Sequence, residues 1–433
     1  MFYRKRKALI SRRKFLVQTG QIAAVALTEA PALSRAATPK ASAPIAETFD
    51  REVNAFMSAR NVPGGALAVI KDGRLVYARG YGSADREKQE SVRADSLFRI
   101  ASISKPFTAI AVFRLIQMAR LQLDARAFDI LELKPLNGHG QDLDPRLKEI
   151  TVRQLLHHTG GWDRDKSGDP MFRSKEIARA AGVSAPANQD PIIRYMLGQK
   201  LDFDPGSHYA YSNFGYCVLG RVIEKLSGMA YDRFVREAVL EPAGIRRMRL
   251  GGSLEARRAE GEVKYYSPND GSSPSVFPGE SKKVSEPYGA FCLEAMDSHG
   301  GWLASAVDLV RFAAAIAVPG KLLKPELYAQ LYEPPAAPVS RKSDGTVASS
   351  YYGCGWNVRP IGKRGNANYW HSGSLPGTAS LLVRRFDGLA WAIVFNQRSR
   401  DPKLPDGAID PALHRAADAV AEWPKEDLFE RYG

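Results

Sequence analysis

Ser102 and Lys105 stand three positions apart in the stretch Ser102-Ile103-Ser104-Lys105. Residues at this spacing lie on one face of a helix, so the hydroxyl and the amine can be neighbours. A serine hydroxyl needs an adjacent base to act as a nucleophile, and a lysine can serve when burial or a nearby positive charge lowers its pKa. The pair therefore predicts an acyl-transfer nucleophile with its base. Taken alone, a capping serine beside a solvated lysine is the simpler interpretation.

A second polar stretch, Tyr211-Ser212-Asn213, carries groups suited to the same chemistry. A tyrosine near a lysine can donate or accept the proton of a leaving group, and we expect the cation to draw its pKa down. The Asn213 amide can orient the lysine and bind a substrate carbonyl. The alternative is a turn, because Pro205-Gly206 precede the stretch and Ser-Asn is a good helix cap.

The third stretch is His371-Ser372-Gly373-Ser374, which lies in a segment of strand character. A glycine within a strand lets a ligand or another backbone approach closely. The alternative is an edge strand and loop with a satisfied surface histidine.

In this order the three stretches resemble the S-x-x-K, Y-x-N and K/H-[ST]-G motifs of the serine β-lactamase and penicillin-binding-protein superfamily. The resemblance is closest to its class C-like branch, which includes carboxylesterases and D-stereospecific peptidases. It extends from about residue 50 to residue 400, with supporting stretches at Pro63-Gly64-Gly65, Leu155 to Gly161, Gly300 to Leu303 and Gly377 to Asn396.

The resemblance implies a role for each matching residue. Ser102 is the acylated serine, Lys105 its general base and Tyr211 the catalytic tyrosine. The resemblance also implies that the substrate-binding residues are Asn213, His371, Gly373 and Ser374. The backbone N–H groups of Ser102 and Ser374 would form the oxyanion hole. His371 stands where many β-lactamases carry lysine. A histidine titrates near 6.5, so a fixed positive charge for a substrate carboxylate is not guaranteed.

The implied activity is hydrolysis of an ester or amide bond through an acyl-Ser102 intermediate, as in a β-lactamase-related carboxylesterase or peptidase. A D-alanyl-D-alanine carboxypeptidase or class C-like β-lactamase is the alternative within the family. A sensor that β-lactams acylate without turnover is the alternative from another class. The substrate would be a small molecule or peptide with an ester, amide or β-lactam carbonyl. No metal or organic cofactor is implied, and no G-x-S-x-G or H-E-x-x-H occurs.

Hydrophobic patterning predicts an α+β fold: an antiparallel β-sheet flanked by helices, with an inserted all-helical domain. We expect a hydrolase domain over residues 46–433, with sheet parts at about 46–101 and 290–433 and a helical insertion at about 102–250. Expected strands are a hairpin of 66–70 and 75–78 with an Asp-Gly turn, a strand-like segment 96–101, and 351–358, 379–384 and 389–395. Expected helices are 50–57, one from Ser102 onward, 213–226, 307–316 and 413–423, and 253–290 is expected to be a surface loop region.

The N-terminus resembles a twin-arginine export signal, with Ser11 to Leu16 followed by a mildly apolar stretch and small residues at Ser34 and Ala36. We therefore expect a signal peptide over 1–36, a linker over 37–45, and a periplasmic or secreted protein. The apolar stretch is too short and too polar to span a bilayer, and no second candidate span follows.

Charge distribution and cysteine content argue against two other classes of protein, nucleic-acid-binding proteins and disulfide-rich proteins. Residues 1–36 hold eight basic residues and one acid, which is half of the net charge of +14. The rest is spread out without a basic stripe, so nucleic-acid binding is not expected. Three cysteines do not make a disulfide framework, and Cys217 lies among apolar residues as a buried side chain would. Nothing in the sequence indicates an oligomeric state.

Overall fold

The structure is a computed structural model that describes residues 44–136, 143–335, 339, 347, 349–362 and 365–432. The predicted signal peptide 1–36 and most of the predicted linker lie outside these residues. Within the described part of the chain, no helix combines the length and apolar character that crossing a membrane requires.

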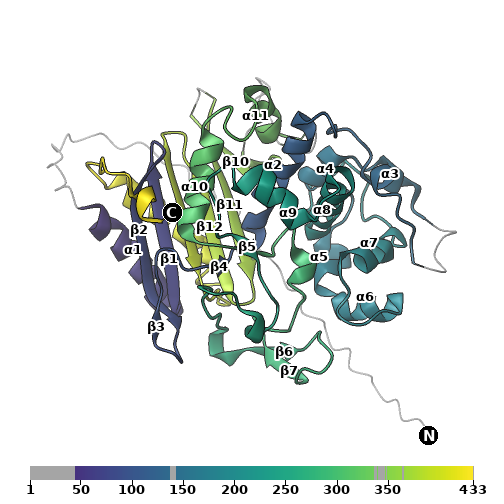
Figure 1. Ribbon diagram of the computed structural model, residues 1–433, viewed down its shortest axis with the longest axis horizontal. Coiled ribbons are helices and arrows are strands. Elements are labelled where there is room, and N and C mark those ends of the chain that lie inside the picture. The colour runs from purple at the N-terminus through teal and green to yellow at the C-terminus, as the bar shows by residue number, and fades with distance from the viewer. Residues whose placement is uncertain are drawn as a thin grey trace, which may run out of the picture. The chain divides into compact units, whose positions relative to one another are not determined.

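An antiparallel sheet of eight strands organises the fold, in the order β3-β2-β1-β13-β12-β11-β10-β9 (Figure 1). Its strands are β1 (Gly64–Lys71), β2 (Arg74–Asp85), β3 (Glu90–Ser91), β9 (Tyr351–Tyr352), β10 (Asn357–Ile361), β11 (Asn366–Leu375), β12 (Thr378–Arg384) and β13 (Leu389–Phe395). β1 from the beginning of the chain pairs with β13 from its end, so the helical middle interrupts the sheet. The predicted α+β class is confirmed.

The predicted hairpin is β1 and β2. Lys71 pairs with Arg74 across the turn, and Asp72 and Gly73 have φ angles of 50° and 81°. Two successive positive φ angles are what the tightest hairpin turn requires, and Asp-Gly adopts them at low cost. The sequence of the turn therefore determines the register next to the turn, and a bulge shifts that register between Ile70 and Val69.

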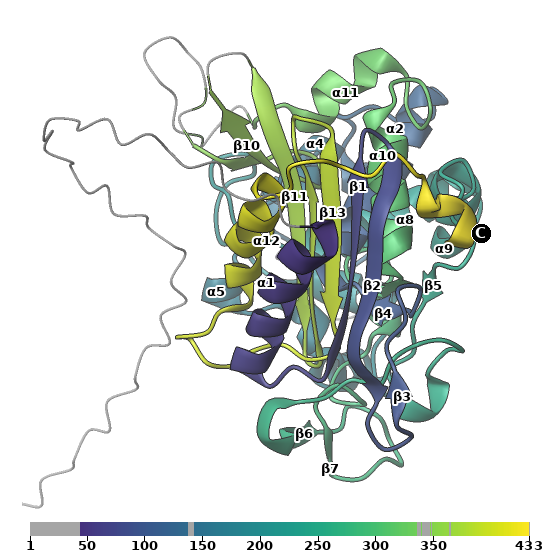
Figure 2. The same ribbon diagram turned by 90° about the vertical axis from the view of Figure 1, so that its left-hand side faces the viewer.

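Two helices cover one face of the sheet: α1 (Ile45–Arg60) and α12 (Ile409–Asp418) lie side by side there (Figure 2). Phe49 of α1 and Leu413 of α12 are buried in one apolar cluster with Trp391 of β13. The expected helix 413–423 begins four residues earlier, because its apolar side already starts at Ile409. Pro411 is compatible with this start, since it lies in the first turn.

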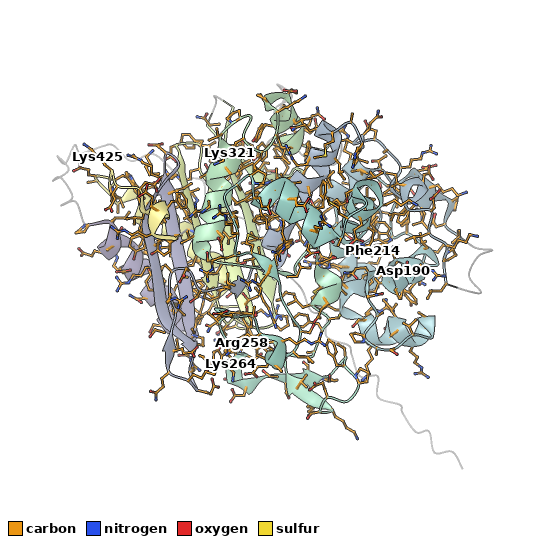
Figure 3. All side chains as sticks on the ribbon, viewed as in Figure 1. Asp190, Phe214, Arg258, Lys264, Lys321 and Lys425 are labelled. Carbon is orange, nitrogen blue, oxygen red and sulfur yellow. The ribbon has the colours of Figure 1, made fainter. Side chains whose placement is uncertain are left out.

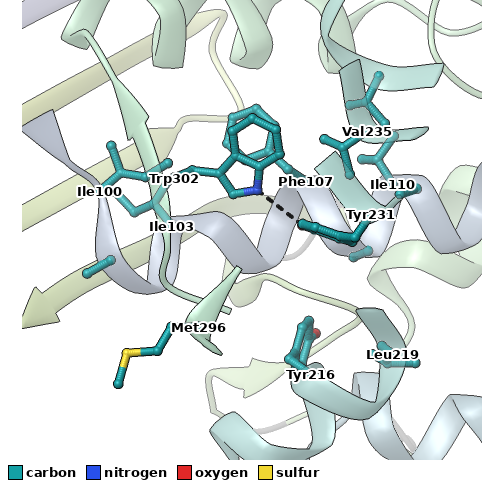
Figure 4. Close-up of a cluster of buried hydrophobic side chains, with 14 of the residues drawn as sticks. Ile100, Ile103, Phe107, Ile110, Tyr216, Leu219, Tyr231, Val235, Met296 and Trp302 are labelled. Carbon is teal, nitrogen blue, oxygen red and sulfur yellow. Dashed lines mark hydrogen bonds between the residues drawn. The ribbon is translucent and has the colours of Figure 1, made fainter. Parts of the chain in front are cut away.

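The opposite face packs against α10 (Ala306–Ala317), α2 (Ser104–Gln117) and, beyond them, α8 (Asn213–Ser227). Figure 4 shows Phe107 and Ile110 of α2 in this core with Tyr231 and Trp302. The indole N–H of Trp302 donates to the Tyr231 hydroxyl over 3.2 Å. The expected helices 213–226 and 307–316 are confirmed as α8 and α10.

The remaining elements are shorter. The helices are α3 (Ala127–Leu131), α4 (Val152–Leu156), α5 (Arg164–Ser167), α6 (Ser174–Ala181), α7 (Gln189–Leu197), α9 (Tyr231–Val235) and α11 (Pro325–Tyr332). The strands are β4 (Phe98–Arg99), β5 (Arg249–Leu250) and β8 (Trp302–Ala304), which form a three-stranded sheet, and the pair β6 (Ser272–Pro274) and β7 (Lys283–Ser285). The strand-like segment 96–101 thus contributes β4 to this small sheet and not to the main one.

The expected strand 351–358 is wrong as a single element. β9 and β10 are a hairpin, and Gly353 to Trp356 form its loop. Gly355 has a φ of 81°, and a Cβ there would lie 2.6 Å from the Cβ of Ala109. This glycine lets the loop pack against the first turns of α2.

The expectation that 253–290 is a surface loop is only half right, since the segment contains little regular structure but much of it is buried. Tyr265 and Tyr288 are buried around the guanidinium of Arg99, which lies 4.4 Å and 5.2 Å from their ring centroids. Arg258 and Lys264, labelled in Figure 3, pair with Asp85 at the end of β2 and with Glu87 just beyond it. The polar composition of residues 253–290 did not predict this burial, because the polar groups of the segment are paired inside the protein.

The sheet fixes the backbone that leads to Ser102. The Thr378 hydroxyl donates to the carbonyl of Arg99 over 2.8 Å, and the Ser380 hydroxyl donates to the carbonyl of Ile100 over 2.9 Å. A Cβ at Gly373 would overlap the same Ile100 carbonyl, so only glycine allows β11 to pack this closely. Three residues of β11 and β12 thereby hold the segment before Ser102.

Thr378→Val should destabilise the fold by about 1–3 kcal/mol, because it removes a buried hydroxyl and leaves the Arg99 carbonyl without this donor. Thr378→Ser keeps the hydroxyl and should recover most of the loss. Urea denaturation of the three proteins checks this, and equal unfolding free energies for Val and Ser variants would contradict it.

Candidate active site

Ser102 lies at the junction between the small sheet and α2. The predicted helix does not begin with a regular turn: Ala101–Ile103 form a 3₁₀ turn, and α2 starts at Ser104. Ala101 has a φ of 47°, an uncommon conformation for a residue with a side chain. Such strain persists only where the surroundings impose it.

Lys105 is completely buried, and its amine touches three oxygen atoms. The Nζ atom lies 2.7 Å from Asn213 Oδ1, 3.0 Å from the carbonyl oxygen of His299, and 3.3 Å from Ser102 Oγ. Burial holds the pKa of Lys105 well below its usual range, and Arg164 acts in the same direction, whereas Asp169 opposes the shift. The amine of Lys105 therefore loses its proton more readily than that of an exposed lysine.

The two carbonyl oxygens decide where the lone pair of the neutral amine points. An amide oxygen and a backbone carbonyl oxygen can only accept, so each takes one of the two N–H groups of a neutral lysine. The third direction, toward Ser102, is then left for the lone pair. In this geometry the amine can accept the proton of the Ser102 hydroxyl.

Tyr211 lies next to both groups. The Nζ of Lys105 is 4.7 Å from its ring centroid, and the guanidinium carbon of Arg164 is 4.9 Å away. Burial raises the pKa of Tyr211, while its Ser102 neighbour acts in the opposite direction. The expected net lowering of this pKa by the cation is thus wrong, because desolvation of the phenolate outweighs the nearby charge. Tyr211 keeps its proton, and its buried hydroxyl makes no well-aligned hydrogen bond with the described residues.

Asn213 links Lys105 to a carboxylate that sequence reasoning missed. Its Oδ1 accepts from Lys105, and its Nδ2 donates to Asp169 Oδ2 over 2.7 Å. Since an ammonium or amine N–H only donates and an ionised carboxylate only accepts, the two partners fix the orientation of the amide. One N–H of Asn213 remains for a substrate carbonyl. Asp169 caps the short 3₁₀ turn Pro170–Phe172. Nothing in that local sequence pattern indicates that Asp169 belongs to the site.

His371 is buried within β11, not on the surface as the alternative interpretation had it. Its Nδ1 donates to the Ser372 carbonyl oxygen over 2.7 Å, so its Nε2 accepts from the Tyr352 hydroxyl over 2.9 Å. Burial, with a smaller contribution from Lys105, lowers the pKa of His371 to about 3. The ring is neutral at physiological pH and supplies no positive charge. Tyr352 is a second residue that the sequence did not indicate.

Gly373 and Ser374 lie at a free edge of β11. β10 pairs with Asn366–Trp370 only, and no described strand covers this edge from His371 to Leu375. Because an unpaired strand edge presents N–H and C=O groups, this one can take an extended ligand. This edge runs beside the 3₁₀ turn that carries Ser102. Gly373 packs against the carbonyl group of Ile100, directly before that turn. The structure therefore brings all seven predicted site residues into one region.

His157 and His158 are buried beside the site. His158 Nδ1 accepts from the backbone N–H of Ser212 over 3.1 Å, and its ring centroid lies 4.3 Å from that of Tyr211. Within the described residues, no group of three or more histidine, cysteine or acidic side chains is arranged to hold a metal ion.

The family model described as Beta-lactamase matches residues 49–415, and the chain belongs to this family of serine hydrolases. The chain is similar to penicillin-binding protein 4* of Bacillus subtilis, with 26% identity over 81% of this chain and 71% of the relative. It is 30% identical to esterase EstB of Burkholderia gladioli over 73% of this chain and 79% of that protein.

Among solved structures, D-amino acid amidase from Ochrobactrum anthropi SV3 matches with a TM-score of 0.66 and 21% identity, over 87% of this chain and 98% of that one. A second match, EstCE1, described as a hydrolase with promiscuous acyltransferase activity, has a TM-score of 0.65 and 19% identity, over 87% and 98%. Both likenesses confirm the fold.

The buried histidines should make the protein less stable in acid. Unfolded histidines take up protons below about pH 6.5, whereas burial lowers the pKa of His371 to about 3 and that of His157 to about 4. The stability that the neutral rings contribute is therefore complete above pH 6.5 and is lost as the pH falls toward the folded pKa values.

The variant His371→Gln isolates one such group. Between pH 7 and pH 5 its unfolding free energy should fall by about 2 kcal/mol less than that of the wild type. Urea denaturation at the two pH values measures both, and an equal fall in the two proteins would show that His371 titrates normally.

Proposed function

We propose that this chain is an exported carboxylesterase that cleaves an uncharged ester through an acyl-Ser102 intermediate. The observation that carries the choice of substrate is the neutral, buried His371. A β-lactam or a D-peptide with a free carboxylate gains most from a fixed cation at this strand, and His371 does not provide one. The esterase relative EstB supports the same choice.

In acylation, Lys105 takes the proton of Ser102 while the oxygen attacks the ester carbonyl. The oxyanion is stabilised by the backbone N–H groups of Ser102 and Ser374. Tyr211 has kept its proton and neighbours both Ser102 and Lys105, so it can protonate the leaving alkoxide and recover a proton from Lys105. The bond to the alkoxide breaks, and the alcohol leaves.

Deacylation uses the same groups in reverse. A water molecule attacks acyl-Ser102, and its proton passes through Tyr211 to the neutral amine of Lys105. Lys105 then returns a proton to the Ser102 oxygen as the carboxylic acid leaves. No acidic side chain touches Ser102 or the Lys105 amine among their described hydrogen-bond partners. Tyrosine-assisted deacylation is therefore the route that these residues support.

A D-alanyl-D-alanine carboxypeptidase or a β-lactamase is the second candidate, and Arg398 is the observation in its favour. The guanidinium of Arg398 lies 3.4 Å from the Ser374 hydroxyl, so a cation stands at one end of the strand edge. Burial lowers the pKa of Arg398, whereas Asp406 lies near enough to oppose this shift and to offset the charge of the guanidinium. The penicillin-binding relative points to the same candidate.

Export to the periplasm or medium is part of the proposal and depends on the twin-arginine-like sequence of residues 1–36. The three cysteines are free and buried, which agrees with a protein that folds without disulfides before export.

Purified mature protein should hydrolyse p-nitrophenyl acetate with a kcat/KM at least about a hundredfold above that for a chromogenic cephalosporin, because the ester needs no cation at His371. Ser102→Ala should abolish both activities. Faster turnover of the cephalosporin would make the chain a β-lactamase, and full activity of Ser102→Ala would contradict the acyl-enzyme mechanism.

Lys105→Ala should reduce acylation at least about a hundredfold, because it removes the amine that contacts Ser102 and takes its proton. Mass spectrometry of the acyl-enzyme and circular dichroism separate loss of chemistry from loss of fold, and Lys105→Met repeats the test with the space refilled. Lys225→Ala, at an exposed lysine of α8, is the control and should behave as the wild type. Rapid acylation of a folded Lys105→Ala protein would exclude Lys105 as the base.

A further inference from the structure

A cavity of about 270 Å³ lies on the far side of the site strand from Lys105, between the sheet and the start of α12. Ser372 and Ser374 of β11 form one wall, and Ile409 of α12 lies opposite. Figure 2 shows α12 lying along this face of the sheet. None of the chemistry described above uses this cavity, although it begins at the proposed oxyanion residue.

The strand register leads from the site into the cavity. Ser374 pairs with Ala379, which pairs with Phe395, and all three line the cavity. A parallel row runs from Ser372 through Leu381 to Ile393. Strands lie about 4.8 Å apart, so each row extends about 10 Å from the strand edge across the sheet. Side chains two residues apart share a face, so both rows lie on the same side.

The far part of both rows is apolar. Leu381, Ile393 and Phe395 are buried, and only the serines nearest the edge carry hydroxyl groups. Apolar cavities of about 150 Å³ already hold a benzene ring, so this larger one has room for an aliphatic chain or an aromatic ring.

The charged groups at the cavity are compensated. Asp410 pairs with Arg359 over 3.1 Å and with His414 over 3.5 Å. Asp406 accepts from the backbone N–H of Ser399 over 2.9 Å, and burial raises its pKa although Arg398 and Arg60 act in the opposite direction. An ion entering the cavity would lose its hydration without gaining a free counter-charge, whereas an uncharged apolar group loses nothing.

We propose that this cavity binds an apolar chain of the substrate, on the acyl or the alkoxy side of the scissile ester. The substrate class is then an ester with one medium-length aliphatic or aromatic substituent. The inference rests on the proposed esterase function and adds a specificity site to it.

The test measures kcat/KM along two homologous series, p-nitrophenyl acetate to octanoate and methyl acetate to octyl acetate. In the wild type one series should rise at least about tenfold from its shortest member to its six-carbon member, because each buried methylene adds to the binding of the transition state. Ala379→Phe places a ring inside the cavity and should remove this preference.

A second variant works in the opposite direction and guards against misfolding of the first. Ile409→Ala enlarges the cavity and should shift the optimum toward longer chains. Its matched control is Leu413→Ala, since Leu413 is a buried aliphatic residue of the same helix that does not line the cavity. The control should lose comparable stability and keep the wild-type preference.

Two outcomes would overturn the inference while leaving the esterase function intact: Ser102-dependent hydrolysis with no preference for chain length in either series, or a preference that both cavity variants leave unchanged. Absence of Ser102-dependent hydrolysis for every ester would instead overturn the proposed function itself, and the cavity inference with it.

Discussion

The buried amine of Lys105 is the constraint on which the rest of the site depends. An ammonium ion inside a protein is costly to desolvate, so the equilibrium shifts toward the neutral amine. The neutral form is useful only if its lone pair faces the nucleophile, and the two carbonyl oxygens of Asn213 and His299 ensure this by taking both N–H groups. Activation of Ser102 and orientation of Lys105 are therefore one arrangement, made by groups that are far apart in the chain.

That arrangement requires the nucleophile to be held from the opposite side. The hydroxyls of Thr378 and Ser380 bind the backbone before Ser102, and Gly373 allows β11 to lie against it. The sheet thus serves two purposes at once, because β11 both supports the turn that carries Ser102 and offers its free edge beside it. A helix beginning at Ser102 without this support would have no reason to adopt the strained Ala101 conformation.

Local patterns predicted what depends on local chemistry. The Asp72-Gly73 turn and the apolar faces of α8 and α10 follow from residues close in sequence, and a spacing of three positions is enough to predict that Ser102 and Lys105 are neighbours. Long-range pairing was not predictable in this way. Asp169 reaches the site from a loop, and Tyr265 is buried by its contact with Arg99, a residue 166 positions away. The pKa of Tyr211 was mispredicted for the same reason, since its burial depends on tertiary packing that no local pattern reports.

Substrate selection follows from the two faces of β11. On the face toward Lys105, His371 is neutral because its two nitrogens are used by Ser372 and Tyr352 and its cation would be desolvated. On the other face, Ser372 and Ser374 open onto apolar side chains, and Asp410 at the same cavity is already paired with Arg359. With His371 neutral and Asp410 already paired, binding energy is available mainly to uncharged, apolar groups. Because side chains alternate between the two faces of β11, this one strand faces the reaction centre on one side. On its other side it faces a binding surface for the apolar group of the substrate.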